Sequence, residues 1–452
     1  MDREDEALAK ELAAAGPGNA MEMRLFTASI DLAQHPLIKA KKAVRARYYA
    51  VLDYFVNRLD SDTVLVQERL LAYRKAMLGD AAPSAVTENF PLELGRWKYR
   101  YVLLCDLALI LVAKGSLQMA YSKLAAYLNR KQSRLLGFLR DALLLDAPFK
   151  RYPVLTQQLI QQYRENRRFW NYRETRFLIT ANMSAGKSTL LNALTGKVVS
   201  SMKSEATTAA LHSVYDKPFQ DGRTSAWDGV FTMDADERTL LAYNAQNTTG
   251  KVYVSTYFAT FVKKAERRFC LIDTPGVNSA MNGEHGRLTR KALQEETFDK
   301  LVYVFNANRL GTDEEMRHLK FVAEHVPKDK VIFVLNKLDA FNKKYDSIEA
   351  SLANIKKDLL AFGYERPRIY PISAYFALLV KKRLTGEILT EDEQDSYALF
   401  AKKFGKPEYD ISRYYPFAAQ IDGVQDGKLA AAAVQCGLYG LESVLYGGMD
   451  TA

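Results

Sequence analysis

Hydrophobic positions follow two different periods along the chain, and the period changes near residue 170. In the first part, apolar residues recur every three to four positions, the spacing of amphipathic helices, over 40–59, 64–77, 97–113 and 117–145. Pro83 and Pro91 bracket a polar loop, and Pro153 precedes one more helical segment. The pattern predicts an N-terminal α-helical bundle domain over residues 1–170.

From Arg176 onward, short apolar runs alternate with helical patterns. These runs are RFLITA, VYVSTYFATF, RRFCLID, LVYVFNA, KVIFVLN and RIYPIS. Runs of this length between helices are typical of a mostly parallel sheet with helices on both faces. We therefore predict an α/β domain over residues 171–450, whose ligand binds at the carboxyl ends of the strands. Residues 377–433 form an unusually long segment within it, which we interpret as a helical insertion of unknown role.

Composition adds a charge asymmetry to this picture. The chain has 452 residues, of which 48% are hydrophobic and 26% charged, an ordinary globular balance. Its net charge is +10, and residues 114–170 alone contain 11 basic and 3 acidic side chains. Such a basic stripe can attract a phosphate-rich surface, either anionic lipid or nucleic acid, or it can be a solvated helix face without a partner.

Cysteine usage and hydropathy argue against a disulfide-rich protein, a zinc-binding protein, a secreted protein and a membrane-spanning run of residues. Cys105, Cys270 and Cys436 lie far apart, so the sequence suggests neither a disulfide framework nor a zinc site. The acidic N-terminus lacks the basic start and apolar core of a secretion signal. The most apolar run, residues 101–113, is shorter than the about 20 residues that span a bilayer. Because Asp106 also interrupts this run, we predict a buried bundle helix there.

The stretch RFLITANMSAGKSTLLNALTG reads as a buried strand, a turn and a helix. Its turn ends in the Gly-Lys-Ser of a phosphate-binding loop, although Ala181 occupies the place of the first glycine in G-x-x-x-x-G-K-[ST]. Ala181 is harmless there if its φ is negative. Lys187 is predicted to reach the β- and γ-phosphates, and Ser188 to bind Mg²⁺. The other predicted nucleotide-binding residues of this stretch are Asn182, Met183, Ser184, Ala185, Gly186 and Thr189.

A second motif, FCLIDTPGVNS, contains the end of the predicted strand RRFCLID and the residues that directly follow it. Asp273 at the strand end is predicted to hold Mg²⁺, and Gly276 to present its N–H to the γ-phosphate. Between the two motifs, SEATTAALHSVYD contains the expected switch threonine that binds Mg²⁺ and the γ-phosphate. We choose Thr208, with Thr207 as the alternative; a pair of β-forming threonines at a strand start would read the same way.

The third motif, VIFVLNKLDAF, predicts a guanine-binding loop. The Asp339 carboxylate can accept hydrogen bonds from N1–H and the exocyclic amine of guanine, a donor pair that adenine lacks. Asn336 is expected to bond the other edge of the base and to tie this loop to the phosphate loop, while the Lys337 stem stacks on the base. Ser373 and Ala374 can offer backbone N–H groups to the guanine carbonyl. The order of all these motifs predicts a P-loop GTPase that binds GTP, GDP and Mg²⁺.

The segments MSAGKSTLLNAL, EATTA, DTPGVNSA, NKLD and CGLYGLESVL resemble the GTPase domain of bacterial dynamin-like proteins over about 176–447. The resemblance implies that two GTPase domains dimerise face to face. It also implies that Ser184 fixes a monovalent cation, K⁺ or Na⁺, and the attacking water, so that the cation replaces an arginine finger. Ser184, Lys187 and Thr208 are then the catalytic residues. A loop-filling hydroxyl is the alternative interpretation of Ser184.

The resemblance also implies a function at a membrane. We expect a GTPase that hydrolyses GTP on dimerisation and couples this to membrane binding or remodelling, with residues 1–170 as a neck or stalk. The expected partners are a second copy, anionic lipid and a second dynamin-like subunit, without specific nucleic acid, and the expected location is the cytoplasm, peripherally on a membrane. Because the family has a long helical region after the GTPase domain, we expect a truncated form or a partner that supplies it.

Two alternatives come from the residues themselves. The basic stripe at 114–170 is also compatible with a switch GTPase that acts on RNA or the ribosome. A nucleotide-binding scaffold with negligible turnover and no membrane role is the other alternative.

Overall fold

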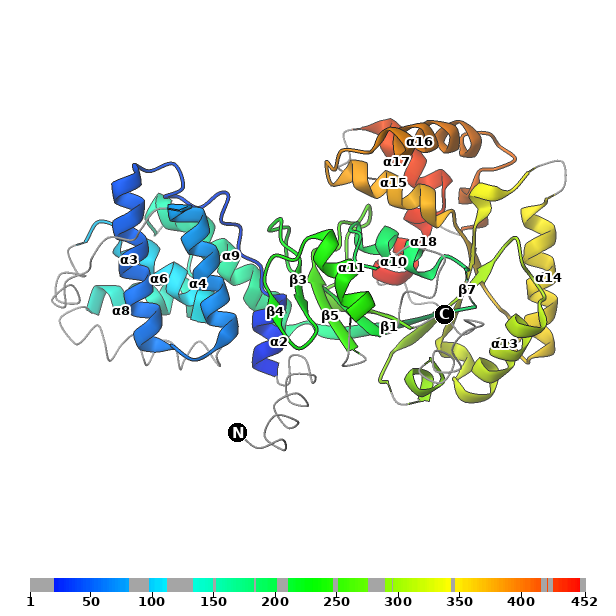
Figure 1. The fold of residues 1–452 in the computed structure, drawn as a ribbon, viewed down its shortest axis with the longest axis horizontal. Helices are drawn as coiled ribbons and strands as arrows, with labels where there is room; N and C mark the ends of the chain where they lie inside the picture. The colour runs from blue at the N-terminus through cyan, green and yellow to red at the C-terminus, as the bar shows by residue number, and fades with distance from the viewer. Residues whose placement is uncertain are drawn as a thin grey trace. The chain divides into compact units, whose positions relative to one another are not determined.

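The computed structural model describes residues 20–80, 97–111, 133–148, 152–182, 184–200, 210–246, 251–274, 289–294, 296–342, 346–415, 421 and 426–447. The chain divides into two compact units (Figure 1). The helical unit consists of residues 1–172 and 217–235, and the sheet unit of residues 173–216 and 236–452. The sequence placed 217–235 in the α/β domain, whereas the structure groups this segment with the helices.

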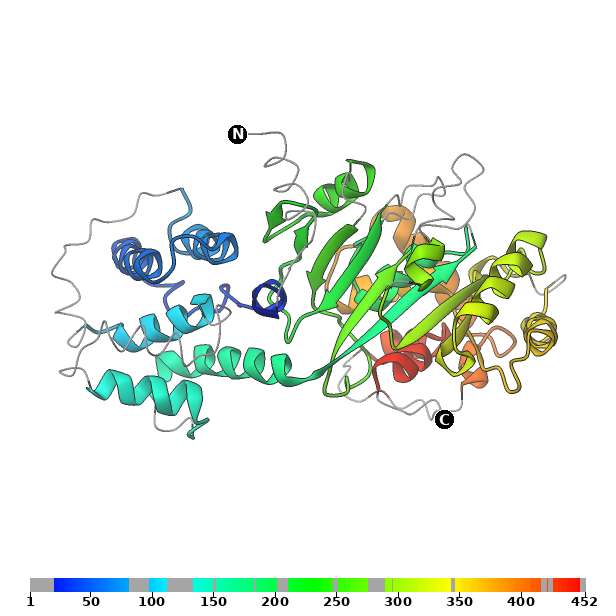
Figure 2. The same ribbon diagram turned by 90° about the horizontal axis from the view of Figure 1, so that it is seen from below.

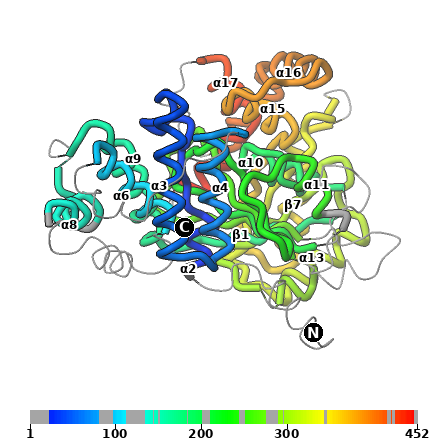
Figure 3. The backbone as a smooth tube through the Cα atoms, turned by 60° about the vertical axis from the view of Figure 1, so that its left-hand side comes forward, coloured from blue at the N-terminus to red at the C-terminus, as the bar shows by residue number. Residues whose placement is uncertain are grey.

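The helical unit contains the helices that the three-to-four spacing predicts over 40–59, 64–77 and 97–113. Part of the fourth predicted helix, 117–145, lies outside the described residues. Helices α3 and α4 pack side by side (Figure 3), and α6 packs against α9. The elements of the helical unit are α2 (Ala20–Thr27), α3 (Lys42–Leu59), α4 (Val64–Leu78), α6 (Arg100–Leu111), α8 (Ser133–Leu139), the π-helix η3 (Arg140–Leu144), α9 (Val154–Asn171), β3 (Ser225–Trp227) and β4 (Phe231–Thr232).

Asp106, which interrupts the most apolar run of the sequence, is fully buried on α6. Its carboxylate accepts hydrogen bonds from His35 Nε2 at 2.9 Å, from the Tyr73 hydroxyl at 3.0 Å and from the Tyr48 hydroxyl. His35 Nδ1 accepts the N–H of Leu37 at 3.1 Å, so the proton of this ring lies on Nε2, toward the carboxylate. The bundle thus satisfies the buried carboxylate within its core, as expected for a buried charged group.

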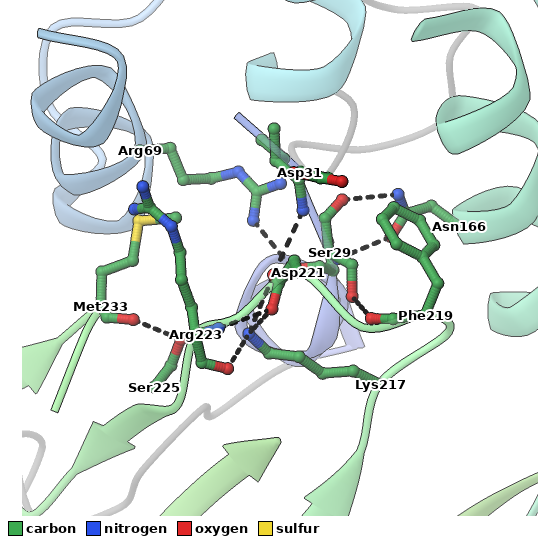
Figure 4. A network of polar contacts seen from close by, with 12 residues as sticks. Ser29, Asp31, Arg69, Asn166, Lys217, Phe219, Asp221, Arg223, Ser225 and Met233 are labelled. Carbon is green, nitrogen blue, oxygen red and sulfur yellow. Dashed lines mark hydrogen bonds and ion pairs between the residues drawn. The ribbon is translucent and has the colours of Figure 1, made fainter. Parts of the chain in front are cut away.

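Residues 217–235 are anchored in the helical unit by the carboxylate of Asp221 (Figure 4). This carboxylate accepts hydrogen bonds from the N–H of Ile30 at 3.2 Å, from the Arg223 N–H at 3.0 Å and from Lys217 Nζ at 3.2 Å. Burial lowers the pKa of Lys217, and the charge of Asp221 opposes that shift. A polar network therefore holds the segment that directly follows strand β2 (Leu211–Asp216) in the chain.

The sheet unit is built on a mostly parallel sheet, as the sequence predicts. Its strand order is β5-β2-β6-β1-β7-β8-β9. Figure 2 shows the strands from below, lying side by side. Strands β2 and β5 are parallel to each other, and β2 is antiparallel to β6, while all the pairs from β6 to β9 are parallel. The strands are β1 (Arg173–Ala181), β2 (Leu211–Asp216), β5 (Lys251–Thr256), β6 (Arg267–Asp273), β7 (Lys300–Asn306), β8 (Val331–Asn336) and β9 (Ile369–Pro371).

Helices cover this sheet and include most of the predicted insertion. Helix α15 packs against α10, α16 and α17, and α17 packs against α18 (Figure 1). Among the described helices, none alone is long and apolar enough to cross a membrane; α17 and α18 reach that measure only as a pair bent by 76°. The helices are α10 (Lys187–Thr195), α11 (Glu237–Gln246), α13 (Asp313–His325), η5 (Lys328–Lys330), η6 (Leu338–Ala340), α14 (Ile348–Ala361), α15 (Ala374–Leu384), α16 (Glu391–Phe404), η7 (Ile411–Tyr414), α17 (Gly427–Gln435) and α18 (Leu438–Tyr446).

The strand register brings the polar strand ends to one edge of the sheet. Ile179 on β1 lies opposite Asp273 on β6, two residues before β1 ends. Asn306 on β7 lies opposite Asn336 on β8, and both residues are the last of their strands. Because carboxyl ends of parallel strands meet at the same edge, the loops that follow β1, β6, β7 and β8 share one site.

Candidate nucleotide-binding site

The loop between β1 and α10 has the backbone that a phosphate-binding loop requires. Gly186 has φ +83°, and a Cβ added there would lie 2.5 Å from Asn336 Nδ2, so only glycine fits. Ala181 is buried at the end of β1 and does not have a positive φ. Ala181 therefore meets the condition on φ that the sequence sets for alanine at this position. The Ala185 N–H closes the turn on the carbonyl of Asn182 at 3.3 Å.

Ser184 stands out in this loop because it is an exposed, non-glycine residue with φ +60°. The left-handed region costs an ordinary L-residue about 1–2 kcal/mol, so neighbouring contacts must hold this conformation. One such contact comes from β7, where Asn306 Nδ2 donates to the carbonyl oxygen of Ser184 at 3.1 Å. The loop thus presents the Ser184 side chain to solvent at the top of the site.

The phosphate loop and the end of β6 meet at the carboxylate of Asp273, which is fully buried. The Lys187 ammonium contacts Oδ1 of Asp273, and both side chains are buried. The Ser200 hydroxyl donates to Oδ2 at 3.1 Å, and Ser188 Oγ lies 3.5 Å from the same oxygen. Hydroxyl and carboxylate oxygens are the ligands that Mg²⁺ prefers. The donor set therefore fits a magnesium ion.

Asn336 joins the phosphate loop to the guanine-reading loop, residues 337–341, which the sequence predicts to bind guanine. Its Nδ2 donates to the carbonyl of Ala185 at 2.9 Å and lies 3.5 Å from that of Gly186. Its Oδ1 accepts the N–H of Ala374 at 3.0 Å, and the N–H of Ser373 donates to the carbonyl of Cys436 at 3.1 Å, so the prediction that these two N–H groups are offered to a guanine carbonyl is wrong for this structure. The expected tie between the two loops is present. Because the amide group is engaged on both sides, the geometry favours a positioning role for Asn336 over direct contact with a base.

The carboxylate of Asp339 is half-buried and oriented by the start of α15. The Ser373 hydroxyl donates to Asp339 Oδ1 at 2.9 Å and accepts the N–H of Phe376, the N-cap bond of α15, at 3.4 Å. Lys337 has φ +73°, and its Cε lies close to Gly186, so its stem runs along the phosphate loop. These contacts leave a carboxylate that can accept the two donors of a guanine edge.

Most of the predicted site residues lie together in the structure, and four lie outside the described residues. The candidates from the phosphate loop, the end of β6, the base loop and the start of α15 lie at one edge of the sheet; Thr189 lies in the first turn of α10. Four candidates, Met183, Thr207, Thr208 and Gly276, lie outside the described residues.

Three contacts of the site were missed from the sequence. Asn306 had a usable signal, because an asparagine ends the apolar run of β7 just as Asn336 ends that of β8. Ser200, which donates to Asp273, follows α10 without any recognisable motif. Lys403 contacts the guanine-reading loop from α16, more than 60 residues further along the chain.

Comparisons with known proteins agree with this site. A family model described as the dynamin family matches residues 178–338. A curated relative, the probable transmembrane GTPase FZO-like, chloroplastic, from Arabidopsis thaliana, is 25% identical over 206 residues. The match covers 45% of this chain and 19% of the relative, so the chain spans about a fifth of the length of that protein.

Solved structures give a weaker likeness. A single-residue variant of Era from Aquifex aeolicus, bound to GDP and AlF₄⁻, is 21% identical with a TM-score of 0.29, and the match covers 48% of this chain and 58% of that one. Toc33 from Arabidopsis thaliana, in complex with Mg²⁺ and GMPPNP, is 16% identical with a TM-score of 0.27, covering 55% of this chain and 78% of that one. At these TM-scores neither structure carries weight for function.

Proposed function

We propose that the dynamin-superfamily GTPase domain, matched over residues 178–338, hydrolyses GTP when two copies dimerise and couples hydrolysis to membrane binding or remodelling. The observation that carries the nucleotide assignment is the pair of hydrogen bonds through Asn336. They hold the phosphate loop and the loop that contains Asp339 in one site. A site with one part for phosphates and one part for guanine is what a GTPase requires.

Each part of the site has a proposed role. Lys187 binds the β- and γ-phosphates, and the backbone N–H groups of the loop surround the phosphate oxygens. Ser188 and Asp273, together with Thr208, hold Mg²⁺, which neutralises charge on the phosphates when bound. Asp339 accepts the N1–H and the exocyclic amine of guanine.

Ser184 is proposed as a catalytic residue of a site that is completed when a second copy binds. Its exposed side chain and its left-handed backbone, held by Asn306, support this role because unusual backbone conformations cluster at functional sites. Lys187 and Thr208 complete the proposed catalytic set. In this proposal, a monovalent cation, K⁺ or Na⁺, supplies the positive charge that an arginine finger supplies in other GTPases.

The membrane role rests on the family and on the connectivity of the chain. The name of the curated relative describes a transmembrane GTPase. Here the chain passes between the two units at 172/173, 216/217 and 235/236, and the second crossing directly follows β2. A conformational change of the sheet unit can therefore be transmitted to the helical unit. We propose a cytoplasmic, peripheral membrane protein whose partners are a second copy, anionic lipid and a second dynamin-like subunit.

Two guanidinium groups of the basic stripe are used within the fold. Within the described part of the stripe, Arg164 contacts Asp146 at 3.0 Å and donates to the carbonyl of Ala142. Arg167 also contacts Asp146 and donates to the carbonyl of Leu143. Since these two guanidinium groups hold the η3 region together, they are partly committed to the fold.

The proposal is tested by the GTPase rate per molecule at increasing protein concentration, in K⁺, Na⁺ and choline buffers, with and without anionic liposomes. A rate that rises with concentration and requires K⁺ or Na⁺ is expected. Anionic liposomes should raise the GTPase rate further, and the protein should sediment with them. A flat rate that is indifferent to the cation would contradict the dimer mechanism, and RNA binding without liposome pelleting would favour the switch GTPase.

A further inference from the structure

The guanine-reading loop is held by an ammonium group from outside the three nucleotide motifs. Lys403, in the last turn of α16, donates from Nζ to the carbonyl oxygens of Leu338 at 3.3 Å, Asp339 at 2.7 Å and Phe341 at 2.5 Å. An ammonium group has three donors, so these bonds use its full capacity. The three carbonyls belong to the turn that contains Asp339, the residue that is proposed to read the base.

Burial lowers the pKa of Lys403, and the charges of Asp339 and Asp346 oppose that shift. The carbonyls belong to the short helix η6 and to the residue that follows it, and that of Leu338 also accepts the Phe341 N–H at 3.2 Å. A positive charge at the C-terminal end of a helix is stabilised by the aligned peptide dipoles. Lys403 Nζ also lies 4.9 Å from the centre of the Tyr409 ring, which adds a cation–π contact. Lys403 therefore caps η6.

Two contacts divide the positioning of Asp339 between them. Ser373 orients the carboxylate through Oδ1, whereas Lys403 fixes the backbone on both sides of the residue. Guanine recognition needs both contacts, because the two hydrogen bonds to guanine depend on the position of the Asp339 carboxylate as well as on its rotation.

From this geometry we propose that Lys403 is a positioning residue for guanine recognition, and that α16 is therefore part of the base-binding half of the site. The inference rests on the proposed function, since it assumes that Asp339 binds guanine. It gives a role to the segment 377–433, which the sequence shows only as a helical insertion.

The test compares Lys403→Met with Lys402→Met by calorimetric titration of GDP and IDP in the presence of Mg²⁺. Met keeps the length of the stem and removes the three donors, while Lys402 is exposed on the same helix turn and controls for the loss of one charge. IDP lacks the exocyclic amine, so the ratio of the GDP and IDP affinities reports the alignment of Asp339. Lys403→Met should lower the GDP affinity about tenfold and the IDP affinity less, so that the ratio falls.

Lys402→Met should keep the affinities and the ratio of the wild-type protein, and Lys403→Arg should restore part of the GDP affinity. An unchanged ratio in Lys403→Met, with GDP and IDP weakened equally or not at all, would overturn the inference. If Lys403→Met does not fold, Lys403→Gln, which retains one donor group, replaces it under the same criterion. Failure of the wild-type protein to bind GDP would instead defeat the proposed function.

Discussion

The two halves of the site are held together in different ways. In the phosphate half, one continuous loop and helix start supply the backbone groups, while the buried carboxylate that pairs with Lys187 comes from Asp273, 86 residues further along the chain. The base half is assembled from distant segments, since Asp339 is held by Ser373 at the start of α15 and by Lys403 at the end of α16. The two halves meet at Asn336.

This difference shows which part of a site a motif can reveal. A phosphate group is bound largely by backbone N–H groups, so a short loop of fixed conformation is sufficient and leaves a recognisable spacing. A base edge is read by one side chain whose position depends on tertiary contacts. We therefore expect substitutions in the phosphate half to remove binding, and substitutions in the base half to change its selectivity.

The largest effect is expected for Lys187→Ala. The substitution removes the charge-assisted contacts to the phosphates and leaves Asp273 buried without its cation, so GTP and GDP affinities should fall by about 10²–10³-fold. Fluorescence titration with labelled nucleotides measures the loss, and circular dichroism shows whether the fold persists. Lys197→Ala, a charge loss shortly after α10, is the matched control and should bind like the wild-type protein. Intact binding in a folded Lys187→Ala protein would refute the phosphate half.

A change of selectivity is expected for Asp339→Asn. An amide offers one acceptor and one donor, which matches the N1–H and the C2 carbonyl of xanthine better than the two donors of guanine. GTP affinity should fall about 10²-fold while XTP affinity rises. Competition titrations with GTP, XTP and ATP measure both changes. Equal loss of all three nucleotides would mean that Asp339 supports the fold and does not read the base.

Ser184→Ala should separate catalysis from binding within the phosphate half. Because the Ser184 side chain is exposed and the loop backbone holds the phosphates, GTP affinity should stay within about twofold. The hydrolysis rate should fall about tenfold or more, with loss of its dependence on K⁺ or Na⁺. Ser188→Ala, which removes a proposed Mg²⁺ ligand, serves as the contrast and should weaken binding. A wild-type rate in Ser184→Ala would assign its hydroxyl to filling the loop.

The smallest effect concerns the scaffold next to the phosphate half. On α13, Glu315 is buried, accepts the N–H of Gly311 at 2.8 Å, and burial raises its pKa to about 7. The folded state thus keeps a proton that the unfolded chain releases near pH 4.5, so stability falls as pH rises from about 4.5 to 7. Glu315→Gln should remove this part of the pH dependence and raise Tm at pH 8 by about 2–4 °C.

Thermal unfolding of both proteins between pH 4 and 8 checks this expectation. Parallel Tm curves for the wild type and Glu315→Gln would show that Glu315 does not titrate in this window. The variant should leave the GDP affinity unchanged, because the side chain contributes to the scaffold and makes no contact with the phosphate loop among the described residues.

The strands and the local motifs of the site could be predicted because their signals are contiguous. Each of the six apolar runs contains or overlaps a strand, and Lys187, Asp273, Asn336 and Asp339 lie at or just beyond the expected strand ends. These features follow from local periodicity and from the rule that ligands bind at the carboxyl ends of parallel strands.

The remaining features depend on contacts between distant segments. The assignment of 217–235 to the helical unit is supported by hydrogen bonds from Ile30 to Asp221 and from Ser29 to the carbonyl of Phe219, which no periodicity reveals. Lys403 is one of two adjacent lysines on α16, and only the folded structure brings it to three carbonyls of the loop that contains Asp339. Tertiary position, and not residue type, distinguishes these groups from their neighbours.

The central claim is that a single site binds a guanine nucleotide through both halves. Its most direct test is calorimetric titration of the wild-type protein with GDP and with ADP, in the presence of Mg²⁺. The account predicts one site per chain for GDP, and at least about 100-fold weaker binding of ADP, because adenine lacks the donor pair that Asp339 accepts. Equal or tighter binding of ADP would contradict it.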